Sequence, residues 1–313
     1  MTAAEEENPW LRLARFSRDH EENKRLWNGY QKYLLRPHTD QYQRQMKNPK
    51  FADIVDLSDA EIHDIQTEIP DLPKEWGEDG GIALTEGLPE IKTRLELNGF
   101  YFAFGVFIRN TIFKSSLTLQ HAQFAEGLYA IECVFEEVLN AVAANFGPFT
   151  TFRECRFIGP ALFNVATFGR SSFSKAIFDE TASFCASIFN ASNTFRDAIF
   201  KGKANFSNAT FDGRIDFDEA TFCNGAPFDD ARPDRSDSPL SFNATKFCKH
   251  PPIFLAARCM KIPIGRVLNY QTPEERLLNV SVSERPTNAP MIRFRWPINH
   301  GTPKRRRLYR GNS

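Results

Sequence analysis

Histidine and cysteine offer this chain its widest range of chemistry, but the spacing of the histidines argues against a catalytic or metal site. The histidines lie far apart in sequence, form no HExxH motif and do not pair with cysteine at metal-ligand spacing. They are His20, His38, His63, His121, His250 and His300. Glycine-rich phosphate loops and GxSxG motifs are also absent. We therefore expect a non-enzymatic protein with no catalytic residue, metal or cofactor.

The 6 cysteines contain no CxxC pair, which in a chain of 313 residues favours reduced thiols over a disulfide framework. Cys133 and Cys155 each precede a phenylalanine by two positions, and we expect them to be small buried apolar residues. Cys185 and Cys223 directly follow a phenylalanine, so we expect them to face outward.

An acidic group near the end of the patterned region could form an anionic surface. Its members are Asp216, Asp218, Glu219, Asp229, Asp230, Asp234 and Asp237. Arginines interrupt it at Arg214, Arg232 and Arg235, and this mixture predicts an ordinary solvated surface.

Charge is divided between the two ends of the chain. Residues 1–100 carry 13 basic and 20 acidic residues, whereas residues 261–313 carry 11 and 3. The basic tail, including Lys304 to Arg307, is the one segment whose charge suits nucleic acid. The acidic amino terminus lacks a secretory pattern, and the longest apolar run, 100–108, is far shorter than a bilayer span. A cytoplasmic protein without a transmembrane segment is expected.

Two helices are predicted before residue 80. Residues 17–35 carry good helix formers with apolar residues on related turns, and Pro37 ends the pattern. Ser58 and Glu61 form a capping-box pattern that predicts a second, shorter helix.

Phenylalanine recurs at steps of five or six residues, a period of neither a helix nor a single strand. This core ladder consists of Phe163, Phe168, Phe173, Phe178, Phe184, Phe189, Phe195, Phe200, Phe206, Phe211, Phe217, Phe222 and Phe228. A fixed short period indicates a solenoid of stacked repeats, and we expect these side chains to form its interior.

The ladder extends backwards through weaker copies to Phe102. We place its earlier positions at Phe102, Phe107, Phe113, Leu119, Phe124, Ala130, Phe135, Ala141, Phe146, Phe152 and Phe157. Many ladder residues are preceded two positions earlier by a small residue, such as Ala204 before Phe206 and Ala209 before Phe211. Residues two positions apart on a strand lie on the same face, so we expect both to point inward.

The segment from Asn205 to Gly213, NFSNATFDG, resembles the pentapeptide-repeat family, whose motif has a central Phe or Leu and a small residue two positions earlier. The resemblance covers 97–259 and implies a right-handed quadrilateral β-helix in which each repeat forms one side of a square coil. Four repeats would make a coil of about 22 residues, giving about six coils from Phe102 to Phe228. Cys133 and Cys155 would then stack in one column.

We therefore expect a mainly β protein with three parts: an acidic, partly helical segment at 1–95, the β-helix at 96–259 and a flexible basic tail at 260–313. The phenylalanine ladder and the absence of catalytic motifs favour a non-enzymatic scaffold that presents its faces to a protein partner, whose identity the sequence leaves open. The alternative is a DNA-mimicking modulator of a type II topoisomerase, DNA gyrase, because some family members resemble duplex DNA in shape and charge. The oligomeric state is also open, and a dimer is compatible with the sequence.

Overall fold

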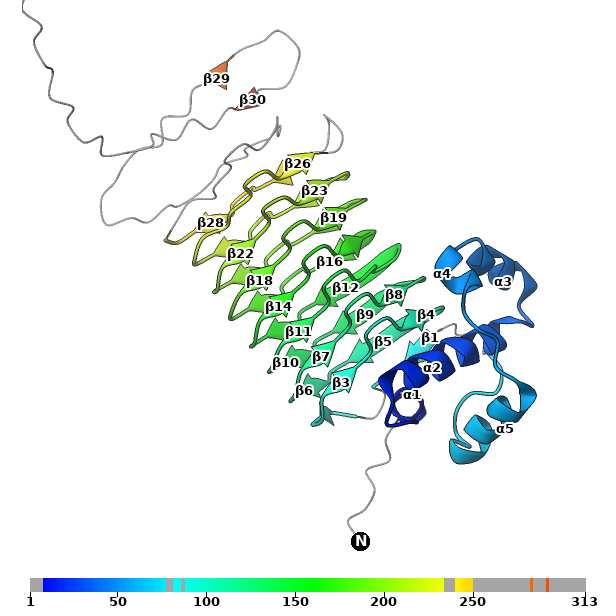
Figure 1. The fold of residues 1–313 in the computed structure, drawn as a ribbon. Coiled ribbons are helices and arrows are strands. Elements are labelled where there is room, and N and C mark those ends of the chain that lie inside the picture. Colours follow the sequence, from blue (N-terminus) through cyan, green and yellow to red (C-terminus); the bar gives the residue numbers. More distant parts are fainter. Residues whose placement is uncertain are drawn as a thin grey trace, which may run out of the picture.

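The computed structural model describes residues 8–76, 81–85, 88–233 and 240–249, together with the backbone of 282–283 and 291–292. Within these residues the chain is a parallel β-solenoid of about 7 turns, preceded by short helices (Figure 1). None of the described helices is long and apolar enough to cross a bilayer. The fold is therefore mainly β, as the sequence predicts.

Four stacks of short parallel strands form the sides of the solenoid, which we name faces A to D. Face A contains β1 (Gly81–Ala83), β5 (Gly105–Arg109), β9 (Leu128–Ile131), β12 (Phe149–Arg153), β16 (Arg170–Ser172), β20 (Asn193–Thr194), β24 (Ile215–Asp216) and β27 (Leu240–Ser241). Face B contains β2 (Glu90–Ile91), β6 (Ile112–Phe113), β10 (Val134–Phe135), β13 (Arg156–Phe157), β17 (Ile177–Phe178), β21 (Ile199–Phe200), β25 (Thr221–Phe222) and β28 (Lys246–Phe247).

The other two faces are completed in the same way. Face C contains β3 (Leu95–Glu96), β7 (Leu117–Thr118), β11 (Leu139–Asn140), β14 (Ala161–Leu162), β18 (Ala182–Ser183) and β22 (Ala204–Asn205). Face D contains β4 (Tyr101–Phe102), β8 (Gln123–Phe124), β15 (Thr167–Phe168), β19 (Ile188–Phe189), β23 (Thr210–Phe211) and β26 (Arg232–Pro233), and bridges through Asn145 join β8 to β15.

The interior is filled by phenylalanine columns. All thirteen residues of the core ladder are at most 1% exposed. Strands pair in register, so that Phe178 lies beside Phe200 one coil later, with ring centroids 4.8 Å apart and planes only 1° from parallel. Many rings also meet another ring of the same coil edge to face, as Phe195 does with Phe206. The core therefore combines stacked and T-shaped aromatic contacts.

Two kinds of corner explain the alternation of five and six residues. At the A-to-B and C-to-D corners the chain turns through a residue with positive φ, such as Asn208 (φ 59°), and the N–H of Ala209 bonds to the carbonyl of Phe206. This is a type II turn, and the step there takes five residues. The steps at the B-to-C corners, such as Phe200 to Phe206, take six.

Val165 occupies one of these positive-φ positions, at φ 59°, and its side chain is 56% exposed. A β-branched residue is strained there and contributes little burial in return. We expect Val165→Asn to raise the free energy of unfolding by about 1 kcal/mol, measured by urea denaturation. The reverse change at the equivalent corner, Asn208→Val, should lower it by a similar amount. Equal stability of both variants and wild type would contradict the assigned turn.

One predicted ladder position is wrong, and the error is local. Phe107 pairs with Tyr129 on the outside of face A, while Ile108 beside it pairs with Ala130 and faces the core. With Ile108 in place of Phe107, the early ladder alternates six and five without exception. Two adjacent apolar residues compete for an inward position, and a shift of one residue reverses the side that each faces.

The solenoid also begins earlier than the predicted boundary at residue 96. β1 and β2 pair with β5 and β6 and form part of a first turn whose inward residues, Ile82 and Ile91, are aliphatic. This turn raises the total from the expected six to about 7. Within the predicted tail the structure describes only an antiparallel pair, β29 (Val282–Ser283) and β30 (Met291–Ile292); the rest lies outside the described residues.

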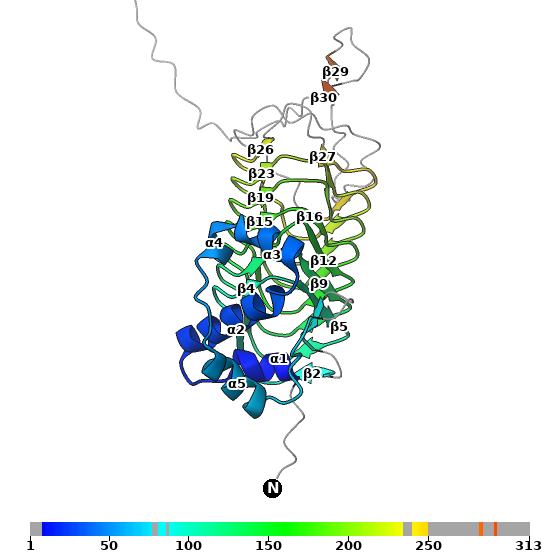
Figure 2. The same ribbon diagram turned by 90° about the vertical axis from the view of Figure 1, so that its right-hand side faces the viewer.

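Helices gather at the β1–β4 end of the solenoid (Figure 2). They are α1 (Pro9–Ala14), α2 (His20–Leu35), α3 (Thr39–Met46), α4 (Pro49–Ala52) and α5 (Asp59–Glu68). The predicted helix at 17–35 is α2, which starts after an Asp19 cap. The predicted capping box is present on α5, where hydrogen bonds from Ser58 lower the pKa of Glu61 to about 2.

Side chains of α2 complete the hydrogen bonds of the first edge. The N–H groups of Tyr101 and Ala103 donate to the side chains of Asn28 and Gln31, both at 2.8 Å, and the indole of Trp27 donates to the carbonyl of Tyr101. β4 pairs with β8 on one side and with α2 on the other. The helices therefore cap this end and protect backbone groups that would otherwise invite a further strand.

Candidate interaction site on face A

A hollow of about 540 Å³ lies on the outside of face A. The residues that line it are Tyr129, Phe149, Thr150, Thr151, Arg170, Ser171, Ser172, Ser192, Asn193, Thr194, Arg214 and Asp216. They come from strands β9 to β24, so the hollow runs along the solenoid axis across several rungs.

Beneath this hollow the core changes from apolar to polar. One inward column of face A consists of Ile82, Val106, Leu128, Thr150, Ser171, Asn193, Ile215 and Leu240. Its three central residues are polar although they are at most 4% exposed, whereas the residues on both sides of them are aliphatic. A buried polar group costs stability unless it is hydrogen-bonded, so the change from aliphatic to polar residues along this column needs a local reason.

Hydrogen bonds satisfy the three polar residues Thr150, Ser171 and Asn193, which we name the polar column. The Oγ1 of Thr150 donates to the carbonyl of Phe146 at 2.6 Å, and Asn193 Oδ1 accepts from both the N–H (2.9 Å) and the Oγ (2.5 Å) of Ser171. The amide of Asn193 also donates to the carbonyl of Ala191. The floor of the hollow is therefore a fixed polar surface.

The corner at the centre of the hollow is one residue shorter than its neighbours. From Phe168 to Phe173 the chain uses five residues, whereas the adjacent D-to-A corners, 146–152 and 189–195, use six. Arg170 lies in this shortened corner, and its backbone N–H bonds to the carbonyl of Pro148. The shortened corner therefore lies at the same place on face A as the polar column.

Aromatic and cationic side chains form the rim. Phe149 is 49% exposed, and the guanidinium of Arg170 lies over its ring, 5.9 Å from the centroid. Tyr129 stacks on Phe107 with centroids 4.9 Å apart. Arg214 stands two rungs beyond Arg170. Exposed aromatic and arginine side chains in one place are typical of binding surfaces.

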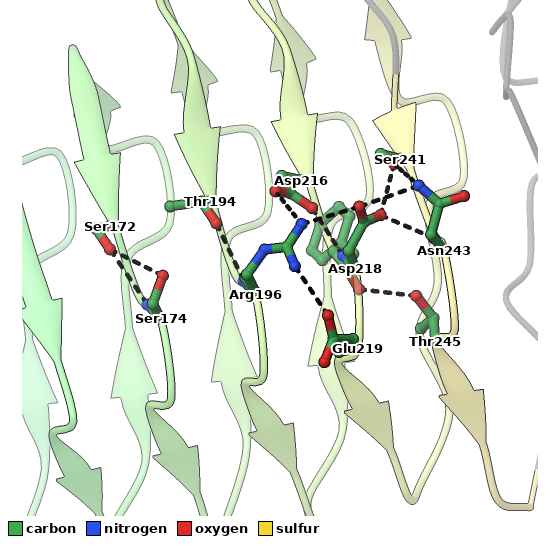
Figure 3. A network of polar contacts seen from close by, with 11 residues as sticks. Ser172, Ser174, Thr194, Arg196, Asp216, Asp218, Glu219, Ser241, Asn243 and Thr245 are labelled. Carbon is green, nitrogen blue, oxygen red and sulfur yellow. Dashed lines mark hydrogen bonds and ion pairs between the residues drawn. The ribbon is translucent and has the colours of Figure 1, made fainter. Parts of the chain in front are cut away.

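An ion-pair network adjoins the hollow (Figure 3). The guanidinium of Arg196 lies 3.5 Å from Asp216, 3.2 Å from Asp218 and 2.8 Å from Glu219. The Asp218 carboxylate also accepts from Ser241 Oγ at 2.5 Å and from the backbone N–H and side-chain amide of Asn243. Burial alone would raise the pKa of Asp218, but these hydrogen bonds and Arg196 together hold it below its usual value.

A second, smaller hollow lies between α3, α4 and face D, and Phe149 borders it as well. Its polar side chains bond to one another: the Tyr101 hydroxyl donates to Gln45 at 2.6 Å and accepts from Asn48 at 3.2 Å. Burial raises the pKa of Tyr101 to about 12. These contacts serve to attach the helical cap.

Of the seven acidic residues noted in the sequence, three meet at Arg196, as described above. Asp218 is nearly buried, at 7% side-chain exposure, so it belongs to the solenoid rather than to a solvated surface. Asp234 and Asp237, Arg235 and the Lys304–Arg307 run lie outside the described residues. Sequence reasoning missed Arg196, because its partners are 20–23 residues away and meet it only across a coil.

The cysteines lie as their spacing predicts. Cys133 and Cys155 are fully buried in adjacent rungs, and Cys185 and Cys223 are half-buried. Cys223 and Cys248 follow paired residues of β25 and β28, and their sulfurs are 3.9 Å apart on face B. Cys259 lies outside the described residues.

The close approach of the Cys223 and Cys248 sulfurs on face B predicts that the two thiols can form a disulfide. Neighbouring parallel strands lie about 4.8 Å apart, within the Cα separation that a disulfide spans. Glutathione disulfide should oxidise the two thiols to a Cys223–Cys248 disulfide, releasing two molecules of glutathione. Non-reducing peptide mapping should detect this cross-link, with Cys133 and Cys155 unmodified. Glutathione adducts on both residues without the cross-link would contradict the geometry, and Cys248→Ser supplies the single-thiol control.

The polar column carried a signal in the sequence that the ladder argument did not use. Thr150, Ser171 and Asn193 each stand two positions before a core phenylalanine, where alanine or cysteine is usual. Three polar residues at this position in three successive coils mark a departure from the repeat.

Comparison with known proteins agrees with this architecture. Residues 141–188 and 195–234 match the family model for pentapeptide repeats, with 9 copies. The matched residues include Thr150 and Ser171 of the polar column and the core ladder except Phe189. No curated protein and no solved structure matches the chain.

Proposed function

We propose that this pentapeptide-repeat protein is a non-enzymatic, cytoplasmic scaffold that binds a protein partner through the hollow of face A. The observation that carries the proposal is the polar column Thr150, Ser171 and Asn193 beneath an exposed aromatic and arginine rim. A solenoid selected for stability alone would keep this column aliphatic, as it does at both ends.

The chemistry of the described residues supports binding rather than catalysis. No group of three or more His, Cys, Asp or Glu within them could hold a metal ion. His20 stacks on Phe100 and bonds to the carbonyl of Asn98, and His121 occupies a positive-φ corner. The contacts of His20 and the turn position of His121 give both residues a role in the fold.

A DNA-mimicking role at gyrase requires a continuous anionic face. Arg196 pairs with three acidic residues on face A, and on face B Asp179 pairs with Arg156 and Lys201. These mixed charges favour the scaffold. A supercoiling assay with purified gyrase separates the two functions: inhibition or protection would support mimicry, and no effect at excess protein would exclude it. Nucleic-acid binding would rest on the basic tail alone.

The test of the scaffold proposal is capture from a lysate of the source organism. Wild type and a control with exposed apolar residues removed from other faces, Ile158→Ala/Ile188→Ala, should retain the same partner. The face A variant Tyr129→Ala/Phe149→Ala should lose it. Capture that is unchanged by the face A variant would place the interaction elsewhere.

A further inference from the structure

We propose that the hollow of face A binds an acidic peptide segment in polyproline II conformation, with acidic side chains three residues apart. This inference rests on the proposed function and specifies the chemistry of its partner. Four features of the hollow support it: its hydrogen-bond donors, its charge, its spacing and its aromatic rim.

Two hydroxyl groups along the hollow, those of Thr151 and Thr194, are arranged as donors. Thr151 Oγ1 accepts the backbone N–H of Arg153, and Thr194 Oγ1 accepts that of Arg196, both at 3.1 Å. A hydroxyl that accepts in this way still has its proton to donate. The surface therefore offers O–H groups to a ligand rich in acceptor oxygens.

The available charge is positive. Neither Arg170 nor Arg214 forms an ion pair within the part of the chain that the structure describes. The single carboxylate in the lining, Asp216, lies 3.5 Å from Arg196 and accepts the N–H of Asp218 at 2.8 Å. A carboxylate ligand would meet two arginines whose charges are not otherwise neutralised.

The spacing of the two arginines favours one peptide conformation. Arg170 belongs to β16 and Arg214 directly precedes β24, two rungs away in the order β16-β20-β24. At about 4.8 Å per rung this separation is about 9.6 Å. Three residues of polyproline II advance about 9.3 Å and return to the same side, whereas same-side residues of a β-strand are about 6.7 Å apart.

The aromatic rim suits proline. Phe149 and Tyr129 stand at the end of the hollow beyond Arg170, on rungs β12 and β9. Proline-rich segments bind to aromatic-lined grooves because their conformation is already extended and little entropy is lost. The Phe149 ring also holds the Arg170 guanidinium in position.

The test uses fluorescein-labelled synthetic peptides and fluorescence polarisation with the full chain. The probe (Pro-Pro-Glu)4 places glutamate on one side of a polyproline II helix. The peptide (Pro-Pro-Lys)4 reverses its charge, and (Pro-Glu)6 changes its spacing. We expect saturable binding of (Pro-Pro-Glu)4, no binding of the lysine peptide, and weaker binding of (Pro-Glu)6. No binding of the first peptide, or equal binding of the third, would overturn the proposal.

Matched variants locate the site. Arg170→Ala/Arg214→Ala should weaken (Pro-Pro-Glu)4 binding about 10-fold or more, since two charge-assisted contacts are lost. Arg94→Ala/Arg156→Ala removes the same charge away from face A and should leave affinity unchanged. Equal losses in both variants would indicate non-specific attraction and overturn the assignment. If the peptide fails while lysate capture still depends on face A, only this inference falls; if capture also fails, the proposed function falls with it.

Discussion

Phe206→Ala is expected to lower the free energy of unfolding by about 3–5 kcal/mol, measured by urea denaturation. The Phe206 ring is fully buried and stacks between Phe184 and Phe228, with centroid separations of 5.0 and 4.9 Å. It also meets Phe195 and Phe217 edge to face. Its loss leaves a cavity in the continuous column that no neighbour can fill without leaving its own stack.

Phe149→Ala is the matched control. This residue is the same type on the same solenoid, but half of its side chain faces the hollow of face A. We expect a loss of less than about 1 kcal/mol, because only about half of its surface is removed from water on folding. Similar losses for both variants would show that ladder position does not determine burial.

Asp218→Ala is expected to cost about 2–4 kcal/mol, the second largest effect. The substitution removes the acceptor of Ser241 Oγ, of the Asn243 N–H and amide, and of one Arg196 contact. The Ser241 and Asn243 donors belong to the last rung of face A, where the Asp216–Ser241 pair joins β24 to β27. The buried Ser241 hydroxyl would be left without its acceptor, and an unpaired buried donor destabilises more than the lost bond alone. A loss below about 0.5 kcal/mol would contradict the network.

Comparing the stability of Asp218→Asn with that of wild type at different pH values isolates the contribution of the Asp218 charge, because asparagine has a similar shape without the charge. The folded pKa of Asp218 is lowered, so its charge stabilises the fold above the unfolded value of about 3.9 and this contribution is lost as pH falls towards the folded value. The stability difference between wild type and Asp218→Asn should therefore shrink below about pH 4.

The fold could be predicted because its signal repeats. Most core phenylalanines of the ladder follow a small residue by two positions, with Ile215 before Phe217 as an exception, so nearly every coil repeats the same pattern. The prediction was wrong at Phe107, because Ile108 competes with it for the inward position. It also missed the turn before residue 96, because the inward positions there are occupied by Ile82 and Ile91 instead of phenylalanine. Short helices such as α4 escape notice because four residues hold no periodicity.

The site was less predictable because it depends on register between coils. Thr150, Ser171 and Asn193 become neighbours only when coils of 21 and 22 residues stack, and Arg170 meets Phe149 through the same register. The shortened corner at 168–173 is visible in the sequence as one step, but its position above a polar column is a property of the assembled face. Side chains from several coils form the surface, and no local motif describes it.

Site-specific photo-cross-linking tests the central claim, that face A is the interaction surface, most directly. Benzoylphenylalanine would replace Ser192, which is exposed and lines the hollow, or Thr181, which is also exposed and lies before β18 on face C. After irradiation in a lysate of the source organism, we expect a discrete protein adduct at position 192 and none at position 181. An adduct at 181 without one at 192, or no adduct at either position, would contradict the account.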